Sequence, residues 1–219
     1  MPQFRFNNNI FMIISLTFTS LLGFPIISPA LPAARDALSI STENIGWIMA
    51  AYSLPGLLFM PLSGLLSDRY GKRRILFPSL FLFGLAGGAC SLAPDQETLF
   101  FLRFIQGIGA SALSTLNVAM VGDLFKGPDR MRVMGFVGAT QNIGSGLLPL
   151  LGGVLAAVAW FYPFGVAMLA IPLGLYMNFA LEEVKRENPP EKTGTRAFLG
   201  HTLSQLNNRI VIELVFMTG

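Results

Sequence analysis

The residues best placed to do chemistry in this sequence are charged side chains beside or inside long apolar stretches. The densest group lies at 64–74 and comprises Gly64, Asp68, Arg69, Gly71, Lys72, Arg73 and Arg74. Asp68 can sit at a helix terminus or pair with a cation, Gly71 can turn the backbone, and Gly64 allows close approach of another helix. This chemistry is ion pairing and backbone turning rather than covalent catalysis.

A second charged group lies within an apolar stretch. Arg103 stands about five residues inside the expected outer boundary of a membrane helix, so it must reach back to the interface or face a polar interior. Helical spacing places Arg103, Ala110 and Asn117 on one face, and we expect the guanidinium to face the interior. Asp123 ends the same stretch, about 30 Å from Arg103 and roughly on the opposite side of the helix.

Small residues and a proline mark the apolar stretch at 134–157. Its members are Gly135, Gly144, Pro149, Gly152 and Gly153. Such a face lets a membrane helix bend and pack closely on a neighbour. Glycine and proline are also common in membrane helices in general, so their presence alone has a second explanation.

The sequence does not predict a metal site, a disulfide or a nucleic-acid-binding surface. Cys90 is the lone cysteine and lies in an apolar run, which excludes an intrachain disulfide and a multi-cysteine metal site. His201 is the lone histidine and has no second ligand candidate nearby. The net charge of +3 comes from short loops rather than from one helix face, which argues against a nucleic-acid partner. We expect no metal, no cofactor and no enzymatic activity.

Composition and apolar run length predict the elements that position these residues. The chain is 53% hydrophobic and 12% charged, too few charges to cover a soluble domain of 219 residues. Stretches of about twenty apolar residues predict membrane helices. Six are found, at 10–32, 45–66, 75–93, 98–122, 134–157 and 162–181. The first also resembles a secretory signal ending at Ser28-Pro29-Ala30, but it is longer than a usual signal core and five more spans follow.

The loop charges predict an orientation. The loops after the second and fourth spans sum to +3 and +2, whereas the outer loops sum to −1, −2 and zero, so the basic loops are expected in the cytoplasm. We expect a six-helix bundle at 1–181, a polar cytoplasmic linker at 182–208 and the start of a seventh membrane helix at 209–219. Eight apolar residues from Ile210 to Met217 cover only about 12 Å of a membrane core, so the seventh helix is expected to be cut early.

Three of these patterns resemble signatures of the major facilitator superfamily. The loop at 64–74 resembles its cytoplasmic loop, the stretch from Leu102 to Ala110 its fourth-helix motif, and the small residues of 134–157 the fifth-helix motif of its antiporters. The last match departs from the pattern at Leu148, where a glycine is expected. The resemblance implies an all-α membrane protein whose six transmembrane helices form the N-terminal half of a major facilitator fold.

The resemblance also implies roles for residues. Asp123 is expected to pair with Lys72 and so hold the loop in the outward-facing state, and Arg103 to serve proton transfer or substrate coupling. The first span contains no mid-membrane carboxylate, so the proton site is expected elsewhere. Aromatic or polar groups within the spans are candidates for the substrate cavity, although each could serve only helix packing. They are Phe18, Tyr52, Asn117, Gln141 and Asn142.

The function implied is export of hydrophobic or amphipathic small molecules by proton-coupled antiport with alternating access. The expected partners are the lipid bilayer, a small-molecule substrate, protons and a C-terminal six-helix half. The expected location is the cell inner membrane, with the N-terminus and the linker cytoplasmic. Two alternatives are a sugar or metabolite exporter of the same fold and a non-transporting membrane assembly subunit, which would purify with a larger complex without substrate-dependent stabilisation. A third is a half-transporter that dimerises.

Overall fold

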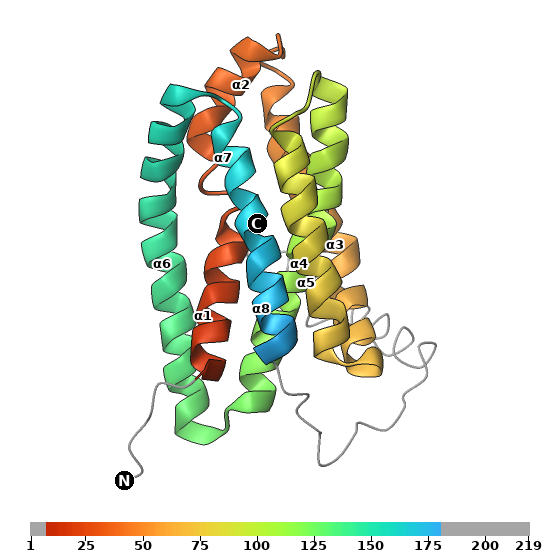
Figure 1. Cartoon of the computed structure of the whole chain (residues 1–219), viewed down its shortest axis with the longest axis vertical. Coiled ribbons are helices and arrows are strands. Elements are labelled where there is room, and N and C mark those ends of the chain that lie inside the picture. Colours follow the sequence, from red (N-terminus) through yellow and green to blue (C-terminus); the bar gives the residue numbers. More distant parts are fainter. Residues whose placement is uncertain (1–7, 181–219) are drawn as a thin grey trace, which may run out of the picture. The chain divides into compact units, whose positions relative to one another are not determined.

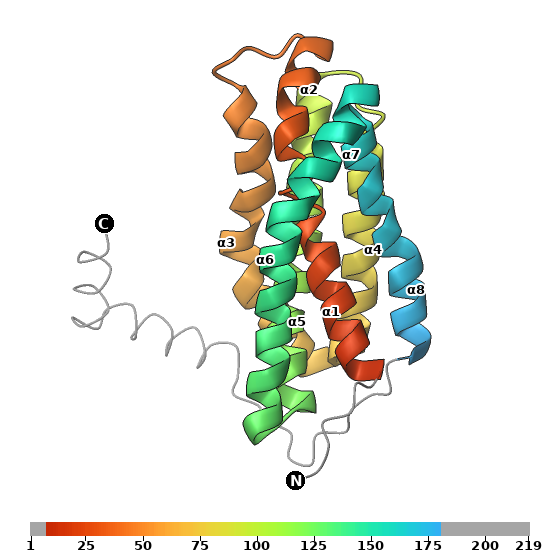
Figure 2. The ribbon, with the colours of Figure 1, turned by 90° about the vertical axis from the view of Figure 1, so that its left-hand side faces the viewer.

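The computed structural model describes residues 8–180, and within that range every regular element is helical (Figure 1, Figure 2). The elements are α1 (Asn8–Leu21), η1 (Ser28–Ala30), α2 (Leu31–Ala37), α3 (Ile45–Tyr70), α4 (Lys72–Cys90), α5 (Gln96–Leu124), α6 (Gly127–Val158), α7 (Tyr162–Gly165), η2 (Val166–Leu169) and α8 (Ala170–Ala180). The long helices lie side by side along a common axis in both views. The linker and the seventh helix expected at 182–219 lie outside the described residues.

Four of the described helices, α3 to α6, are long and apolar enough to cross a membrane. They confirm the spans predicted at 45–66, 75–93, 98–122 and 134–157. Each helix begins and ends within a few residues of its prediction, except that α6 starts earlier, at Gly127. Continuous apolar runs bounded by Gly71, Asp95 and Lys126 explain this agreement, because the ends of the helices coincide with polar or glycine positions.

The first span is broken, contrary to the prediction of one helix over 10–32. Helix α1 ends at Leu21 after 14 residues, or about 21 Å, and the next regular element is η1 at Ser28. Gly23, Pro25 and Pro29 cause the break, because proline removes a backbone donor and disfavours helical geometry in the residue before it. We call residues 22–27 the α1 break. Within it the carbonyls of Phe24 and Ile27 accept local backbone hydrogen bonds, whereas the carbonyl of Gly23 accepts one from outside the helix.

The sixth span is also interrupted. Residues 162–180 form α7, the 3-10 segment η2 and α8 rather than one α-helix. Glycines of α4 face this segment, because a Cβ on Gly87 would collide with Ala167 and one on Gly88 would lie 2.5 Å from the Cγ of Met168. The tighter 3-10 segment thus packs against a part of α4 where glycines leave no side chains in the way.

Helix α5 occupies the middle of the described bundle, in contact with α1, α3 and α4. Its small residues allow this: a Cβ on Gly107 would collide with the backbone carbonyl of Tyr52 in α3, and one on Gly109 would lie 2.9 Å from backbone atoms of α4. At its start the Asp95 carboxylate accepts a hydrogen bond of 2.8 Å from the Thr98 backbone N–H. This cap holds the pKa of Asp95 below its usual value.

The glycines of α6 divide between two faces. Gly144, Leu148 and Gly152 are buried, and a Cβ on Gly144 would lie 2.5 Å from Leu21 in α1. A Cβ on Gly152 would collide with the carbonyl of Ile26 in the α1 break. A Cβ on Gly135 would meet nothing within 4 Å among the described residues, so this glycine takes no part in the packing. Leu148, the departure from the antiporter pattern, fills its position and is 1% exposed.

Gly152→Ala should destabilise the protein by about 1–3 kcal/mol, because the added methyl group overlaps the Ile26 carbonyl and the backbone must shift. Thermal unfolding of the purified protein measures this loss. Gly146→Ala is the matched control on the same helix, since a Cβ there meets nothing within 4 Å; it should stabilise by up to about 1 kcal/mol through helix propensity. Equal effects of the two substitutions would contradict the packing described.

Candidate functional site

Arg103 of α5 forms the first part of the site, and its side chain is fully buried. Its Nη1 donates to the Oε1 of Gln106 at 2.7 Å, and its Nη2 donates to the backbone carbonyl of Gly23 at 2.8 Å. The same Nη2 lies 3.7 Å from the sulfur of Met49 in α3. Arg103 therefore faces the interior, as the helical spacing predicted, and it joins α5 to the α1 break.

Two aromatic rings enclose the Arg103 guanidinium. Its central carbon lies 4.5 Å from the centroid of the Tyr52 ring in α3 and 5.8 Å from that of Phe164 in α7. Ring faces attract a cation, and the attraction is larger where water is excluded. Tyr52 is also fixed against the α1 break, because its hydroxyl occupies the space that a Cβ on Gly23 would need.

The Arg103 guanidinium has neutral partners. The observed contacts are an amide, a backbone carbonyl, a thioether and two rings. Two buried donors, Nε of Arg103 and Nε2 of Gln106, have no hydrogen-bond partner among residues 8–180. A buried charge without an anion is costly, and in membrane helices such charges mark functional positions. We call Arg103, Gln106, Gly23, Tyr52 and Phe164 the arginine centre.

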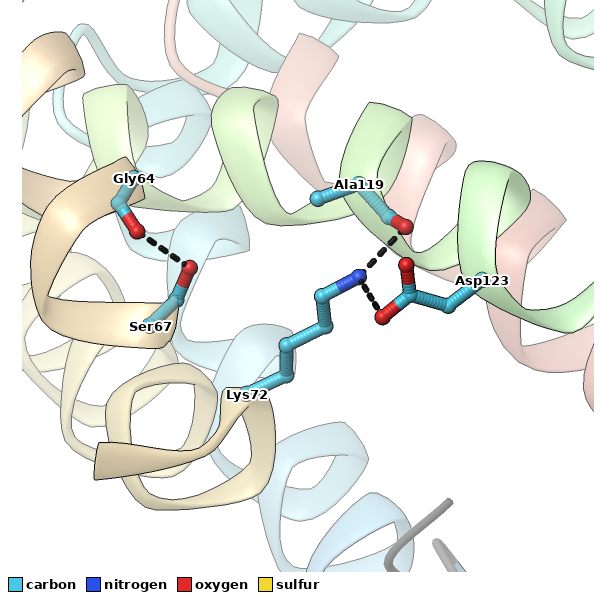
Figure 3. Close-up of polar contacts among 5 residues, drawn as sticks. All are labelled: Gly64, Ser67, Lys72, Ala119 and Asp123. Atoms are coloured by element: carbon cyan, nitrogen blue, oxygen red, sulfur yellow. Dashed lines mark hydrogen bonds and ion pairs between the residues drawn. The ribbon is translucent and has the colours of Figure 1, made fainter. Parts of the chain in front are cut away.

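The second part of the site joins the start of α4 to the end of α5 (Figure 3). The Nζ of Lys72 lies 2.5 Å from the Oδ2 of Asp123 and donates to the backbone carbonyl of Ala119 at 2.5 Å. The side chains are only 15% and 26% exposed, so water screens this pair less than a surface ion pair. The structure thus contains the pair that the resemblance implied.

Of the two glycines expected to shape the loop before Lys72, Gly71 does so and Gly64 does not. Gly71 has a φ of +93°, a value that residues with a side chain rarely adopt, and it makes the turn between α3 and α4. The expectation that Gly64 permits close helix approach is wrong for this structure. A Cβ there would meet Thr115 of α5 at 3.6 Å, an ordinary contact, and the close approach of α3 to α5 occurs at Gly107 instead.

The other charged residues of the loop point to different neighbours. Asp68 and Arg69 lie exposed in the last turn of α3, and the Arg69 guanidinium is 5.5 Å from the ring centroid of Tyr70. Arg73 donates from Nε to the Oδ1 of Asn178 in α8 at 3.2 Å, whereas Arg74 is exposed. The loop therefore contacts α5 through Lys72 and α8 through Arg73.

The structure places the predicted cavity residues in different surroundings. Tyr52 belongs to the arginine centre, and Asn117 is 5% exposed and donates to the Oγ1 of Thr17 in α1 at 2.7 Å. Phe18 is 42% exposed, and Gln141 and Asn142 lie exposed on α6. Asn117 thus joins two helices rather than lining an open cavity, although its Oδ1 is buried without a partner.

Sequence reasoning missed several members of the arginine centre. Gln106 lies three residues after Arg103, a spacing that places both on one helix face and could have identified it. Gly23 lies two residues before Pro25, which signals a break that frees a carbonyl. Phe164, and Met49 beside the centre, carry no such signal, because apolar residues in membrane helices are common. Among the described residues no group of three or more His, Cys, Asp or Glu side chains could hold a metal ion.

Comparison with known proteins identifies the family. The model described as Major Facilitator Superfamily matches residues 13–219. The bacillibactin exporter of Bacillus subtilis (strain 168) is 32% identical over 163 residues, which cover 71% of this chain and 40% of the exporter. The multidrug resistance protein Stp of Mycobacterium tuberculosis (strain CDC 1551 / Oshkosh) is 34% identical over 177 residues, which cover 77% of this chain and 33% of Stp. The chain thus spans two fifths or less of the length of these relatives.

Solved structures agree on the fold. The proton:xylose symporter XylE, bound to 6-bromo-6-deoxy-D-glucose, matches with a TM-score of 0.66 at 19% identity, covering 80% of this chain and 45% of XylE. The human organic anion transporter MFSD10 matches with a TM-score of 0.66 at 22% identity, covering 85% of this chain and 51% of MFSD10. At these identities the match supports the fold and says nothing of the substrate. The described helices correspond to about half of each transporter.

Arg103→Lys should lower the free energy of unfolding by about 1–3 kcal/mol, because one ammonium cannot reach both the Gly23 carbonyl and Gln106 and leaves a buried acceptor unpaired. Chemical or thermal unfolding in detergent measures the loss. Arg130→Lys, at an exposed position of α6, is the control and should have little effect. A variant as stable as the parent would show that Arg103 does not hold the α1 break.

A double-mutant cycle on Lys72 and Asp123 should give a coupling energy of about 1 kcal/mol, above that of an exposed pair, because both side chains are mostly buried. The comparison pair is Arg132 and Asp129, which are 54% and 52% exposed at 3.2 Å and should couple by about 0.5 kcal/mol or less. The unfolding free energies of the proteins in each cycle give the two coupling energies, and they are measured at low and at high salt. Equal coupling in the two cycles would argue against a special role for the Lys72 pair.

Proposed function

The chain belongs to the Major Facilitator Superfamily, and from this membership we propose that it forms the N-terminal part of a proton-coupled exporter of small hydrophobic or amphipathic molecules. Members of this family are multi-pass membrane transporters. We also propose that the protein lies in the inner membrane. The Lys72 end of the bundle then faces the cytoplasm, because the loops there carry the excess of basic residues.

The observation that carries the proposal is the Lys72 and Asp123 pair. It ties the first residue of α4 to the last turn of α5, and Lys72 reaches the Ala119 carbonyl in the same contact. An ion pair at helix ends is a discrete contact that one conformation makes and another loses, so it can bias an equilibrium between inward-open and outward-open states. Asp68, at the end of α3, is the proposed second acidic member of this device.

Export is supported by the relatives and by α6. The named functions of the bacillibactin exporter and of Stp, a multidrug resistance protein, are those of outward transport or resistance. The buried face of α6 at Gly144, Leu148 and Gly152 lies against α1 and the α1 break. A close, smooth interface of this kind suits helices that slide or rock against each other during a cycle.

Arg103 is the proposed link between protonation and the helices of this chain. No anion lies against its charge in the part of the chain that the structure describes, so the electrostatic potential of the site favours a deprotonated carboxylate nearby. We assign that carboxylate to a part of the protein beyond these six spans, because the first span lacks one. Protonation there would weaken its attraction to Arg103, and the α1 break, which Arg103 holds, would respond.

A polar substrate is the second candidate. Asn117 and Gln106 are buried, and each has an amide atom that finds no partner within 8–180, the Oδ1 and the Nε2 respectively. A sugar or another metabolite with several hydroxyls could satisfy such groups, whereas a purely hydrophobic compound could not. Competition by unlabelled sugars against a fluorescent cationic substrate separates the two candidates.

Export of a fluorescent lipophilic cation from cells with the full-length protein tests the proposal. Asp68→Asn, Asp123→Asn and a protonophore should each reduce export by at least about tenfold, because each removes a coupling element or the proton gradient. Arg132→Gln is the control, since its ion pair with Asp129 is exposed, and it should transport normally. Unchanged export in the Asp68→Asn and Asp123→Asn variants would contradict the mechanism, and export that resists the protonophore would contradict proton coupling.

A further inference from the structure

A pocket of about 300 Å³ opens where α4 begins, and the proposed transport cycle makes no use of it. Its lining residues are Arg73, Arg74, Phe77, Pro78 and Asn178. All but Asn178 come from the first two turns of α4, and Asn178 comes from α8. The pocket thus combines two guanidinium groups with an apolar wall.

The polar wall of the pocket is suited to an anion. Helix α4 begins with three basic residues, has no acidic residue in its first turn, and has no side-chain cap on its first amides. The N-terminal end of a helix carries partial positive charge, which normally favours acidic side chains there. Lys72 is directed to Asp123, whereas the Arg73 guanidinium is fixed at the pocket by its bond to Asn178. The positive charge of this wall therefore comes from Arg73 and Arg74, and the hydrogen bond to Asn178 holds the Arg73 guanidinium in place.

The apolar wall continues from the pocket along α4. The rings of Phe77 and Phe81 stack, with centroids 6.1 Å apart and planes at 27°. Farther along the helix Phe81, Leu82 and Leu85 are 40%, 36% and 47% exposed among the described residues. A small inorganic anion would use only the guanidinium groups, while a phospholipid would use both walls, the headgroup at Arg73 and Arg74 and a chain along Phe77 and Phe81.

We propose that this pocket binds the phosphate group of an anionic phospholipid, with an acyl chain against the stacked rings of Phe77 and Phe81. Guanidinium groups form paired, charge-assisted hydrogen bonds with phosphate oxygens. The pocket lies at one end of a helix that crosses the membrane, the depth at which lipid headgroups meet basic side chains. The direction and the substrate of transport do not enter this proposal.

The test uses the full-length protein in nanodiscs of phosphatidylcholine to which phosphatidylglycerol is added. The thermal unfolding midpoint of the parent should rise and saturate with the phosphatidylglycerol fraction. Arg74→Gln should raise the half-saturating fraction by about tenfold, because it removes one charge-assisted contact. Phe77→Ala should also weaken the response. Arg74 is exposed, so its replacement should leave the fold intact.

The controls separate a built site from general charge attraction. Arg130→Gln removes the same charge from an exposed position of α6 outside the pocket and should respond to phosphatidylglycerol like the parent. Inorganic phosphate in pure phosphatidylcholine should not shift the midpoint. A parent-like response of Arg74→Gln, or an equal loss in Arg130→Gln, would overturn the proposal. A shift by inorganic phosphate as large as that by phosphatidylglycerol would identify a free-phosphate site and overturn the lipid assignment.

Discussion

The bond from the Arg103 guanidinium to the Gly23 carbonyl is the interaction on which the described helices most depend. It requires that the first crossing be broken, because a carbonyl inside a continuous helix would already have an intrahelical partner. It also requires that α3 and α7 supply ring faces, since no anion from the described helices lies on the guanidinium. The break, the buried charge and the two rings are thus one arrangement, and each would be costly without the others.

The packing of α5 and α6 serves this arrangement. Glycines bring α5 close to α3 and α4, which places the Tyr52 ring over Arg103. On the other side of the α1 break, Gly152 of α6 lies against the Ile26 carbonyl, so the break is held between two helices rather than exposed. The Lys72 pair lies well away from it along α5, near the last turn of that helix. One helix therefore carries both the buried charge and the contact proposed to respond to the transport cycle.

Much of the fold could be predicted because a membrane helix needs a long apolar run, and four such runs are uninterrupted in α3 to α6. The first and sixth runs are equally apolar, but hydropathy does not report backbone conformation, so their interruptions were not predicted. The Lys72 and Asp123 pair followed from a resemblance rather than from spacing. The cavity residues could not be predicted from residue type, because the partner of Asn117 is Thr17, which is 100 positions away in the sequence.

Tyr52 contacts three other segments through three of its parts. Its ring faces the guanidinium of α5, its hydroxyl fills the space beside Gly23, and its backbone carbonyl lies against Gly107. A side chain at position 23 would need a smaller residue at position 52, because the Tyr52 hydroxyl fills that space. A side chain at position 107 would need the backbone of α3 to move away, because the Tyr52 carbonyl lies there. Residues 23, 52 and 107 therefore constrain one another sterically, although the three positions belong to different helices or connections.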